Sequence, residues 1–438
     1  MNVLHVIPSV AAKEGGPSFA VKAMTEALVR EGVQVTIATT TGSRELATAS
    51  PSTRGQGARH GESVHCQTRS EERENGYGII CFRREFEPYK VSFGLTRWLR
   101  KNVARFDLVH VHALFSFSST MATRIARQHS VPYLVRPLGV LNRWGMENRR
   151  PILKRVSFRL VELPILLNSA AIHYTSNAER AEAASLDPHL AEHRSATISL
   201  PIERSEPGDA ELFRARYPAL KKHRVILFLS RIHPMKGLEL LIDAFAMVRE
   251  KNKDVALVIA GDGEESYVRE LKKRAKSDRE TTRPQDNETA GQRDYETTGQ
   301  RDRGRVVSGQ LSGGLSSDVI WTGHLSGEMK AAALAAADVF VLPSASENFG
   351  IAAAESLAAG LPTIVSEEVA LSSDIRRYDA GVVVKRDVQQ LAGAISDLLS
   401  NKEKAASLAA NGRRLAEERY SPEAVGRALH ELYQKLIT

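Results

Sequence analysis

Two glutamates, Glu347 and Glu355, lie eight residues apart at a place where a chain can bind an anion. The apolar run 337–344 precedes them and indicates a buried parallel strand, while the alanine-rich run 351–359 favours a helix. Glu347 therefore lies in the loop at the carboxyl end of a strand, and Glu355 lies roughly 7.5 Å further along the helix axis. Because the helix side around Glu355 is otherwise apolar, its carboxylate needs a partner, and sugar hydroxyls are suitable partners.

The residues between this strand and helix are Asn348, Phe349 and Gly350, whose backbone N–H groups are free at a helix start. Such groups, together with the helix dipole, favour binding of a phosphate. Two acids would then flank a phosphate-sized site. The plainer interpretation is that Glu347 complements the helix dipole and Glu355 is solvated, and this stretch alone does not decide between the two.

Two cations occupy a similar place earlier in the chain. Arg231 and Lys236 flank a turn between the apolar strand 225–230 and the amphipathic helix 238–248. A guanidinium, an ammonium and the amides of a helix start form a strong clamp for a diphosphate, although two solvated cations are the alternative. The next strand, 255–260, ends in a turn that begins with Gly261 and Asp262.

The N-terminal part offers a glycine turn and a histidine at equivalent positions. Gly15 and Gly16 follow the first strand and precede the helix 18–30, so another group could approach the backbone closely there. The turn lacks the GxGxxG pattern of a dinucleotide site, and by itself it is explained as a tight turn. His112 lies near the carboxyl end of the strand 107–113, where ligands bind in open α/β sheets, although a lone histidine in a strand is usually structural.

The elements that must position these residues alternate between strand and helix through both halves of the chain. This pattern predicts an α/β fold with two doubly wound parallel sheets. Pro207 and Gly208 mark a linker, so we expect an N-terminal domain at 1–205 and a C-terminal domain at 206–438. The polar range 43–76 is expected to be a mobile insertion. The range 278–317, which contains a tandem octapeptide, is expected to be a disordered one.

The composition is that of an ordinary globular protein with a basic excess. The chain has 438 residues, a net charge of +8 and two cysteines, Cys66 and Cys81. Two cysteines give neither a disulfide framework nor a metal pattern, so a reducing cytosol is the expected setting. No apolar run approaches the ~18 residues of a membrane helix, and the first residues indicate a strand, not a signal peptide.

The positive charge is concentrated in two ranges, 97–105 and 143–159. The second range carries six Arg or Lys residues against one Glu, with Trp144 and Phe158 among them. A solvated helix face is the default interpretation, and peripheral contact with an anionic membrane is the sharper one. No nucleic-acid-binding module accompanies the charge, so we do not expect a nucleic acid partner.

Several of these motifs occur together in one known family. They are Ser230-Arg231 through Lys236-Gly237, Gly261-Asp262-Gly263, Ser346–Glu355 followed by Ala-Ala-Gly-Leu-Pro, Gly15-Gly16-Pro17 and the strand 107–112. With them the chain resembles the retaining glycosyltransferases of family four, over nearly its whole length apart from the two insertions. The resemblance implies a GT-B fold, in which two Rossmann-like domains face each other across a cleft and the last helix, at about 421–438, packs on the N-terminal domain.

The resemblance also implies roles for individual residues. Arg231 and Lys236 would hold the donor diphosphate, Glu355 the ribose and Glu347 the hydroxyls of the transferred sugar. Gly16 would approach the phosphate and His112 would contact the sugar, while Gly15, Gly261, Asp262, Asn348, Phe349 and Gly350 would complete the donor site. No metal and no cofactor are implied. The chain departs from many relatives at Leu138, where a basic residue or histidine is common.

The resulting expectation is a retaining, metal-independent hexosyltransferase in polysaccharide or cell-envelope biosynthesis. It would use a nucleotide-diphosphate sugar and a glycan or lipid-linked glycan acceptor, in the cytoplasm and at the inner face of the membrane. The alternatives are a sugar-nucleotide epimerase with the same fold and a non-catalytic sugar-nucleotide-binding protein. The base, the sugar, the acceptor, the linkage and the oligomeric state are not indicated by any motif.

Overall fold

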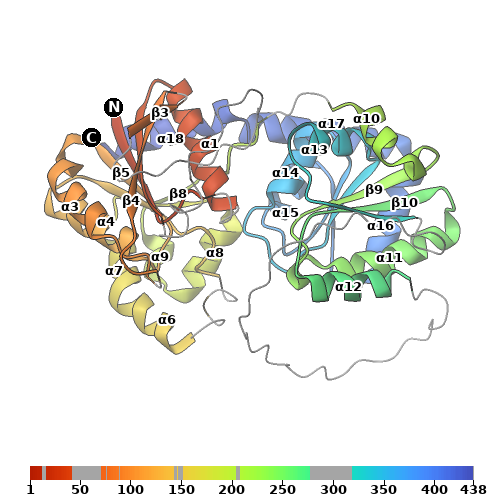
Figure 1. Ribbon diagram of the computed structural model, residues 1–438, viewed down its shortest axis with the longest axis horizontal. Coiled ribbons are helices and arrows are strands. Elements are labelled where there is room, and N and C mark those ends of the chain that lie inside the picture. The colour runs from red at the N-terminus through yellow and green to blue at the C-terminus, as the bar shows by residue number, and fades with distance from the viewer. Residues whose placement is uncertain are drawn as a thin grey trace, which may run out of the picture.

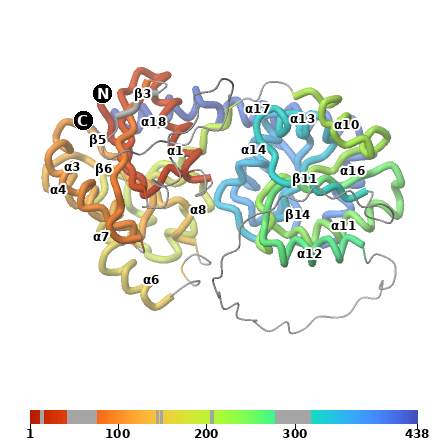
Figure 2. Tube along the Cα trace, in the orientation of Figure 1, coloured from red at the N-terminus to blue at the C-terminus, as the bar shows by residue number. Residues whose placement is uncertain are grey.

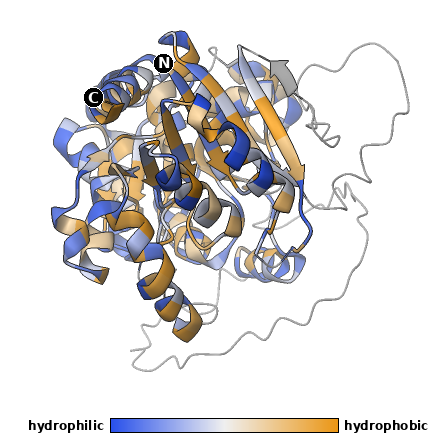
Figure 3. Cartoon of the chain, turned by 90° about the vertical axis from the view of Figure 1, so that its left-hand side faces the viewer, coloured by the Kyte–Doolittle hydropathy of each residue, from blue (hydrophilic) through white to orange (hydrophobic). Residues whose placement is uncertain are grey.

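The protein forms two α/β lobes that are joined by its C-terminal helices (Figure 1). The computed structural model describes residues 1–11, 16–41, 71–74 as backbone, 76–87, 89–142, 146, 151–203, 208–276 and 318–437. The predicted disordered insertion at 278–317 lies outside these residues. Hydrophobic residues are concentrated in the strands, and the helices that cover them alternate between hydrophobic and hydrophilic positions (Figure 3).

Within these ranges, the N-terminal lobe has one sheet of eight strands in the order β3-β4-β2-β1-β5-β6-β7-β8. All neighbouring strands are parallel except the edge pair β3 and β4. The strands are β1 (Asn2–Ile7), β2 (Gln34–Thr41), β3 (Glu71–Glu74), β4 (Tyr77–Arg83), β5 (Leu108–His112), β6 (Tyr133–Arg136), β7 (Ala171–Tyr174) and β8 (Ser195–Thr197). Its helices are α1 (Gly16–Arg30), α3 (Phe93–Asn102), α4 (Phe117–Gln128), α6 (Pro151–Ser157), α7 (Leu163–Leu167), α8 (Asn177–Leu186) and α9 (His189–Glu192).

The C-terminal lobe has a fully parallel sheet, whose six described strands follow the order β11-β10-β9-β12-β13-β14. They are β9 (Arg224–Leu229), β10 (Val255–Ala260), β11 (Val319–Gly323), β12 (Val339–Leu342), β13 (Thr363–Ser366) and β14 (Val382–Val384). The helices are α10 (Ala210–Arg216), α11 (Leu238–Lys251), α12 (Glu265–Arg274), α13 (Gly327–Ala336), α14 (Ile351–Ala359), α15 (Ser372–Tyr378) and α16 (Val388–Ser400). The prediction of two doubly wound parallel sheets is confirmed.

The chain returns to the N-terminal lobe through its last two helices, α17 (Lys402–Arg419) and α18 (Pro422–Ile437). Figure 2 shows them crossing the top of the molecule, so that the C-terminus lies beside the N-terminal lobe. The α18 helix packs against α1 because Gly426 has no side chain and lies directly on the carbonyl of Ala27. The buried side chain of Tyr433 reaches the sheet beneath.

Two expectations from the sequence need correction. The range 43–76 is not an insertion throughout: residues 71–74 form strand β3, which pairs with β4 across a turn at Gly76, where φ is 86°. Residues 42–70 and 75 lie outside the described chain. Cys81 in β4 is disulfide-bonded, so the expectation that the cysteines form no disulfide is wrong. A disulfide is typical of an oxidising compartment, and it removes the argument for a reducing one.

Candidate active site

The loop after β12 and the helix α14 form the centre of the site in the C-terminal lobe. The α14 helix runs from Ile351 to Ala359, as predicted, between Gly350 (φ 91°) and Gly360 (φ 71°), which both adopt left-handed backbone conformations. These conformations suit glycine and explain why the helix begins and ends at these residues. The side chain of Phe349 is buried against Tyr420, with ring centroids 5.4 Å apart, so only its backbone can face a ligand.

Lys236 and Glu347, which come from two different loops of this lobe, form an ion pair. The turn that carries Lys236 lies against the loop after β12, since Gly237 (φ 69°) packs on the carbonyl of Pro343 and Ala345 N donates to Met235 O at 2.7 Å. The exposed fractions of the two side chains are 11% and 20%, so the pair is largely shielded from water. The family resemblance implies that Lys236 binds the donor diphosphate and that Glu347 binds the hydroxyls of the transferred sugar. In the structure these two side chains contact each other directly.

A second ion pair involves a residue within α14. Lys330 Nζ in α13 lies 2.7 Å from Glu355 Oε1. Sugar hydroxyls are the partners predicted for Glu355, and its contact with Lys330 is not predicted from the sequence. The one signal that could have found it is a single lysine within the alanine-rich run of α13. The Glu355 carboxylate is thus already compensated by a charge, and it still presents a second oxygen for a hydroxyl donor.

The segment after β9 brings Arg231 to the same edge of the sheet. Ile232 bridges to Gly263, Ser230 N donates to Ala260 O at 3.0 Å and Ile232 N donates to Asp262 O at 2.8 Å. Gly261 (φ 146°) and Gly263 lie so close to Ser230 and Ile232 that a side chain at either position would overlap the backbone. The Gly-Asp-Gly turn therefore has a structural reason, namely to keep this segment beside β10. The Arg231 side chain is exposed.

The N-terminal lobe reaches this site at two places. A Cβ atom on Gly16 would lie 3.5 Å from Ile351 Cδ1, and one on Gly139 would lie 2.5 Å from Asn348 Cγ. Gly16 and Gly139 thus face the first residue of α14 and the residue next to Glu347. Gly15 lies outside the described residues. The predicted glycine turn and the predicted acidic motif, far apart in sequence, meet between the lobes.

The loop that carries Gly139 is held by a buried glutamate. Glu179 accepts hydrogen bonds from Gly139 N at 2.6 Å and from Thr175 N at 2.7 Å. Burial raises the pKa of Glu179, while these two amides and Arg136 oppose the shift. Leu138 in this loop has a left-handed backbone (φ 62°), as do Ala113 and Phe115 in the loop after β5. Such strained residues are concentrated at functional sites, and these lie at the carboxyl edge of the N-terminal sheet.

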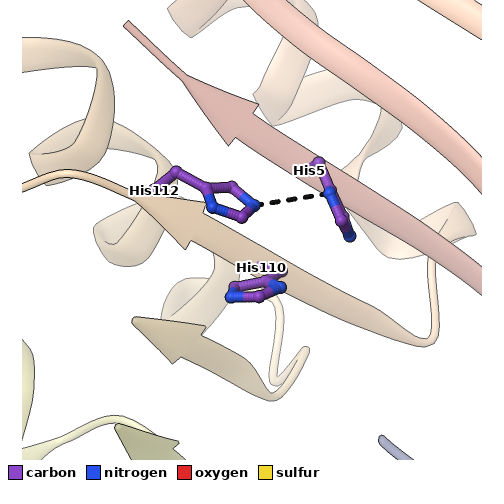
Figure 4. Close-up of side chains that lie close together, drawn as sticks. All are labelled: His5, His110 and His112. Atoms are coloured by element: carbon purple, nitrogen blue, oxygen red, sulfur yellow. Dashed lines mark hydrogen bonds between the residues drawn. The ribbon is translucent and has the colours of Figure 1, made fainter. Parts of the chain in front are cut away.

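His112 ends β5 at this edge but is fully buried. It belongs to a cluster with His5, His110 and His173 on one face of the sheet, and burial lowers the pKa of all four rings. Figure 4 shows that the His112 ring points toward His5, while His110 lies beneath it. Among the described residues, His5, His110 and His112 are the only group whose ligand atoms are close enough to hold a metal ion, within 4.8 Å of one another. Contact between His112 and a sugar stays a prediction.

Comparison with known proteins identifies the family. The model "Glycosyl transferase 4-like domain" matches residues 15–194, and "Glycosyl transferases group 1" matches residues 209–280 and 304–415. The two models cover both lobes and between them contain Gly16, His112, Arg231, Lys236, Glu347 and Glu355. The chain belongs to the GT-B glycosyltransferases that these models describe.

Two relatives and one solved structure illustrate the similarity. An uncharacterised glycosyltransferase of Bacillus subtilis, YqgM, is 24% identical over 81% of this chain and 85% of its own length. A GDP-mannose-dependent alpha-(1-6)-phosphatidylinositol monomannoside mannosyltransferase of Mycobacterium tuberculosis is 28% identical, over 48% of this chain and 47% of that protein. The structure of HepE from Anabaena, in complex with UDP and glucose, superposes with a TM-score of 0.67 over 99% of this chain and 100% of that one, at 14% identity. This last likeness shows the fold.

Proposed function

We propose that the protein transfers a hexosyl unit from a nucleotide-diphosphate sugar to a glycan or lipid-linked glycan, with retention of configuration and without a metal. The observation that carries the proposal is the shielded Lys236–Glu347 ion pair at the start of α14, opposite Gly16 and Gly139 of the other lobe. Fixed charge, a helix start and closely approaching backbone of the other lobe lie near one another there, and this supports the proposal.

Each group has a chemical task in this proposal. When the bond between the sugar C1 atom and the diphosphate breaks, negative charge develops on the leaving oxygen. Arg231, Lys236 and the amides at the start of α14 would stabilise this charge, which is the type of contribution that usually dominates such catalysis. The acceptor oxygen would bond to C1 on the same face, and its proton would pass to the leaving phosphate. Glu347 would hold the sugar hydroxyls and Glu355 the ribose hydroxyls.

The donor can be identified by the stability that it confers. A ligand that binds the folded state alone raises the melting temperature as its concentration exceeds its Kd. We expect one class among UDP-, GDP- and ADP-sugars to raise the melting temperature. In Glu355→Ala the same rise should need at least a tenfold higher ligand concentration. Transfer with that donor, with product stereochemistry read by NMR, tests the reaction itself. An epimerised nucleotide sugar formed without acceptor would support the epimerase alternative.

A lipid-linked acceptor is suggested by the surface of the N-terminal lobe around α6. Ile152 and Leu160 are 77% and 73% exposed, and the exposed Arg155 and Arg159 lie between them. Exposed apolar residues interleaved with cations are typical of a helix that lies in an anionic membrane surface. The α6 helix projects from the bottom of its lobe, away from α18 (Figure 1). No helix within the described ranges is long and apolar enough to cross a membrane. The exposed residues therefore support peripheral contact with an anionic membrane surface, which we include in the proposal.

This contact can be measured by liposome flotation. The double variant Ile152→Ser/Leu160→Ser is expected to lose most of the binding to vesicles that contain anionic lipid, because it removes the apolar part of the contact. Arg155→Gln/Arg159→Gln should lower binding by about a factor of ten and reduce its salt dependence. Met247→Ser changes an exposed apolar residue of the C-terminal lobe, 39% exposed, and should leave binding unchanged. Equal flotation of all variants would show that α6 is only a solvated face.

A further inference from the structure

The buried histidines of the N-terminal sheet form a continuous chain of hydrogen bonds whose direction is fixed at one end. The first link is between His173 Nε2 and the carbonyl oxygen of Ile198, at 2.9 Å. A carbonyl oxygen can only accept, so Nε2 of His173 carries the hydrogen. The ring is neutral, because burial lowers its pKa to about 3 and Arg136 acts in the same direction. Its Nδ1 atom is therefore a bare acceptor.

The direction of donation in each hydrogen bond then fixes the direction in the next one. His173 Nδ1 lies 3.3 Å from His110 Nε2, so His110 donates and its own Nδ1 is bare. The Tyr433 hydroxyl, 2.7 Å from His110 Nδ1, must then donate to it. With its one hydrogen used, Tyr433 accepts from His5 Nε2 at 3.2 Å. His5 is buried and neutral, so its Nδ1 is bare as well.

The series of hydrogen bonds ends at His112. Its Nε2 lies 3.3 Å from His5 Nδ1 and must donate, which leaves His112 Nδ1 without a hydrogen. Within the described part of the protein, this buried Nδ1 atom has no hydrogen-bond partner. The Thr25 hydroxyl, 3.4 Å from His5 Nδ1, can donate or accept and so does not set the direction. Every lone pair of the four rings is accounted for except this one.

We propose that the Ile198 carbonyl fixes the tautomer of His112 through His173, His110, Tyr433 and His5, so that His112 Nδ1 is held ready to accept a hydrogen bond from a substrate hydroxyl. His5, His110, His173 and Tyr433 are positioning residues in this scheme. The proposal rests on the proposed function only for the identity of the ligand, a sugar hydroxyl. In this scheme α18 contributes to the site, because the Tyr433 hydroxyl that links His110 to His5 belongs to that helix.

This assignment competes with a metal site formed by His5, His110 and His112. A metal ion binds nitrogen lone pairs, whereas His112 Nε2 carries a hydrogen in the chain described here. The buried guanidinium of Arg136 also lies close enough to lower the pKa of these rings, and it would repel a cation in the same way. The hydrogen-bond chain therefore explains the cluster without a metal ion.

The test is histidine-selective 15N NMR of the full-length protein, in which protonated and bare ring nitrogens resonate far apart. Single His→Gln variants assign the signals. We expect His5, His110, His112 and His173 all to be neutral at pH 7 with the hydrogen on Nε2. A hydrogen on Nδ1 of any of the four, or a charged ring, would overturn the proposal, and this outcome does not depend on transfer activity.

The variant Tyr433→Phe interrupts the chain of hydrogen bonds between His110 and His5. His110 and His173 should keep their tautomer because they remain bound to the Ile198 carbonyl, whereas His5 and His112 should become mixtures of tautomers. Tyr420→Phe removes another buried hydroxyl, which donates to Asp374 at 2.8 Å in the C-terminal lobe, and should leave all four rings unchanged. Unchanged spectra of His5 and His112 in Tyr433→Phe would show that the direction is not transmitted.

Two additions complete the experiment. When UDP-glucose or GDP-mannose binds, as judged by a raised melting temperature, the Nδ1 signal of His112 should move as its lone pair accepts a hydrogen bond. A bound donor that leaves this signal unchanged would refute the acceptor role, while transfer measured in the same sample tests the proposed function separately. Zinc chloride alone should not shift the four rings. A zinc-dependent shift that a chelator reverses would replace the proposal with a metal site.

Discussion

Replacing Lys236 with alanine is expected to lower the rate of sugar transfer by a factor of about 100 to 1,000. The substitution removes the shielded ammonium that would oppose the charge developing on the leaving diphosphate, and removal of one such group typically costs this much. It also leaves Glu347 without its partner beside the transferred sugar. The fold should survive, because neither side chain belongs to the hydrophobic core of the lobe. Initial rates with the donor identified by thermal shift would measure the effect.

The matched control breaks another lysine–carboxylate pair in the same lobe. Lys404 at the start of α17 lies 2.7 Å from Asp397 in α16. Neither residue belongs to the proposed site, so Lys404→Ala should leave the transfer rate within a factor of two. Circular dichroism and the melting temperature of both variants would separate a local effect from unfolding. Wild-type activity in Lys236→Ala, or in Glu355→Ala, would refute the assignment of these residues to the donor site.

The arrangement of strands and helices could be predicted because local signals and burial agree along most of the chain. Strand β10 and helix α14 have the predicted bounds, since each run ends at a glycine. The proximity of Lys236 to Glu347 also follows from the fold, because the carboxyl ends of adjacent parallel strands β9 and β12 share one edge.

Contacts between elements without a sequence pattern could not be predicted. The pairing of Lys330 with Glu355 depends on the packing of α13 beside α14, which no spacing reveals. The histidine cluster joins three strands and the last helix, and only the pair His110 and His112 lies close in sequence. Strand β3 was missed because four charged or polar residues carry no strand signal, and their pairing is imposed by the open edge of β4.

The stability of the protein is expected to fall steeply below pH 6.5, because of the four buried histidines. Burial lowers the pKa of His5 and His173 to about 3 and holds the pKa of His110 and His112 well below the usual value. In the unfolded chain these rings titrate near pH 6.5. Above that pH neither state binds the protons. Below it the unfolded state binds them and the folded state does not, so acid favours unfolding.

The expected slope is about 1.4 kcal/mol per pH unit for each ring, or roughly 5 kcal/mol per pH unit for the four together. Two buried acids act in the opposite direction. Burial raises the pKa of Glu162 to about 7 and also raises that of Glu179, so the folded state gains protons at these groups first. At pH 4.5 the two rings with a pKa of about 3, His5 and His173, would remove roughly 5 kcal/mol, against about 3 kcal/mol returned by Glu162. Four rings act against two acids, so we expect acid to destabilise the protein on balance, and a few kcal/mol matter against the roughly 5–15 kcal/mol that stabilises an ordinary domain.

Urea unfolding at a series of pH values between 7.5 and 4.5 measures this slope, and a variant isolates the contribution of one ring. His173→Gln should reduce the slope by about 1.4 kcal/mol per pH unit, because the group that takes up a proton on unfolding is gone. His129→Gln replaces an exposed histidine at the end of α4 and should leave the slope unchanged. If His173→Gln and the wild type lose stability in parallel as the pH falls, then His173 must already bind a proton in the folded protein. In that case the ring could not serve as the neutral first link that gives His112 its bare nitrogen.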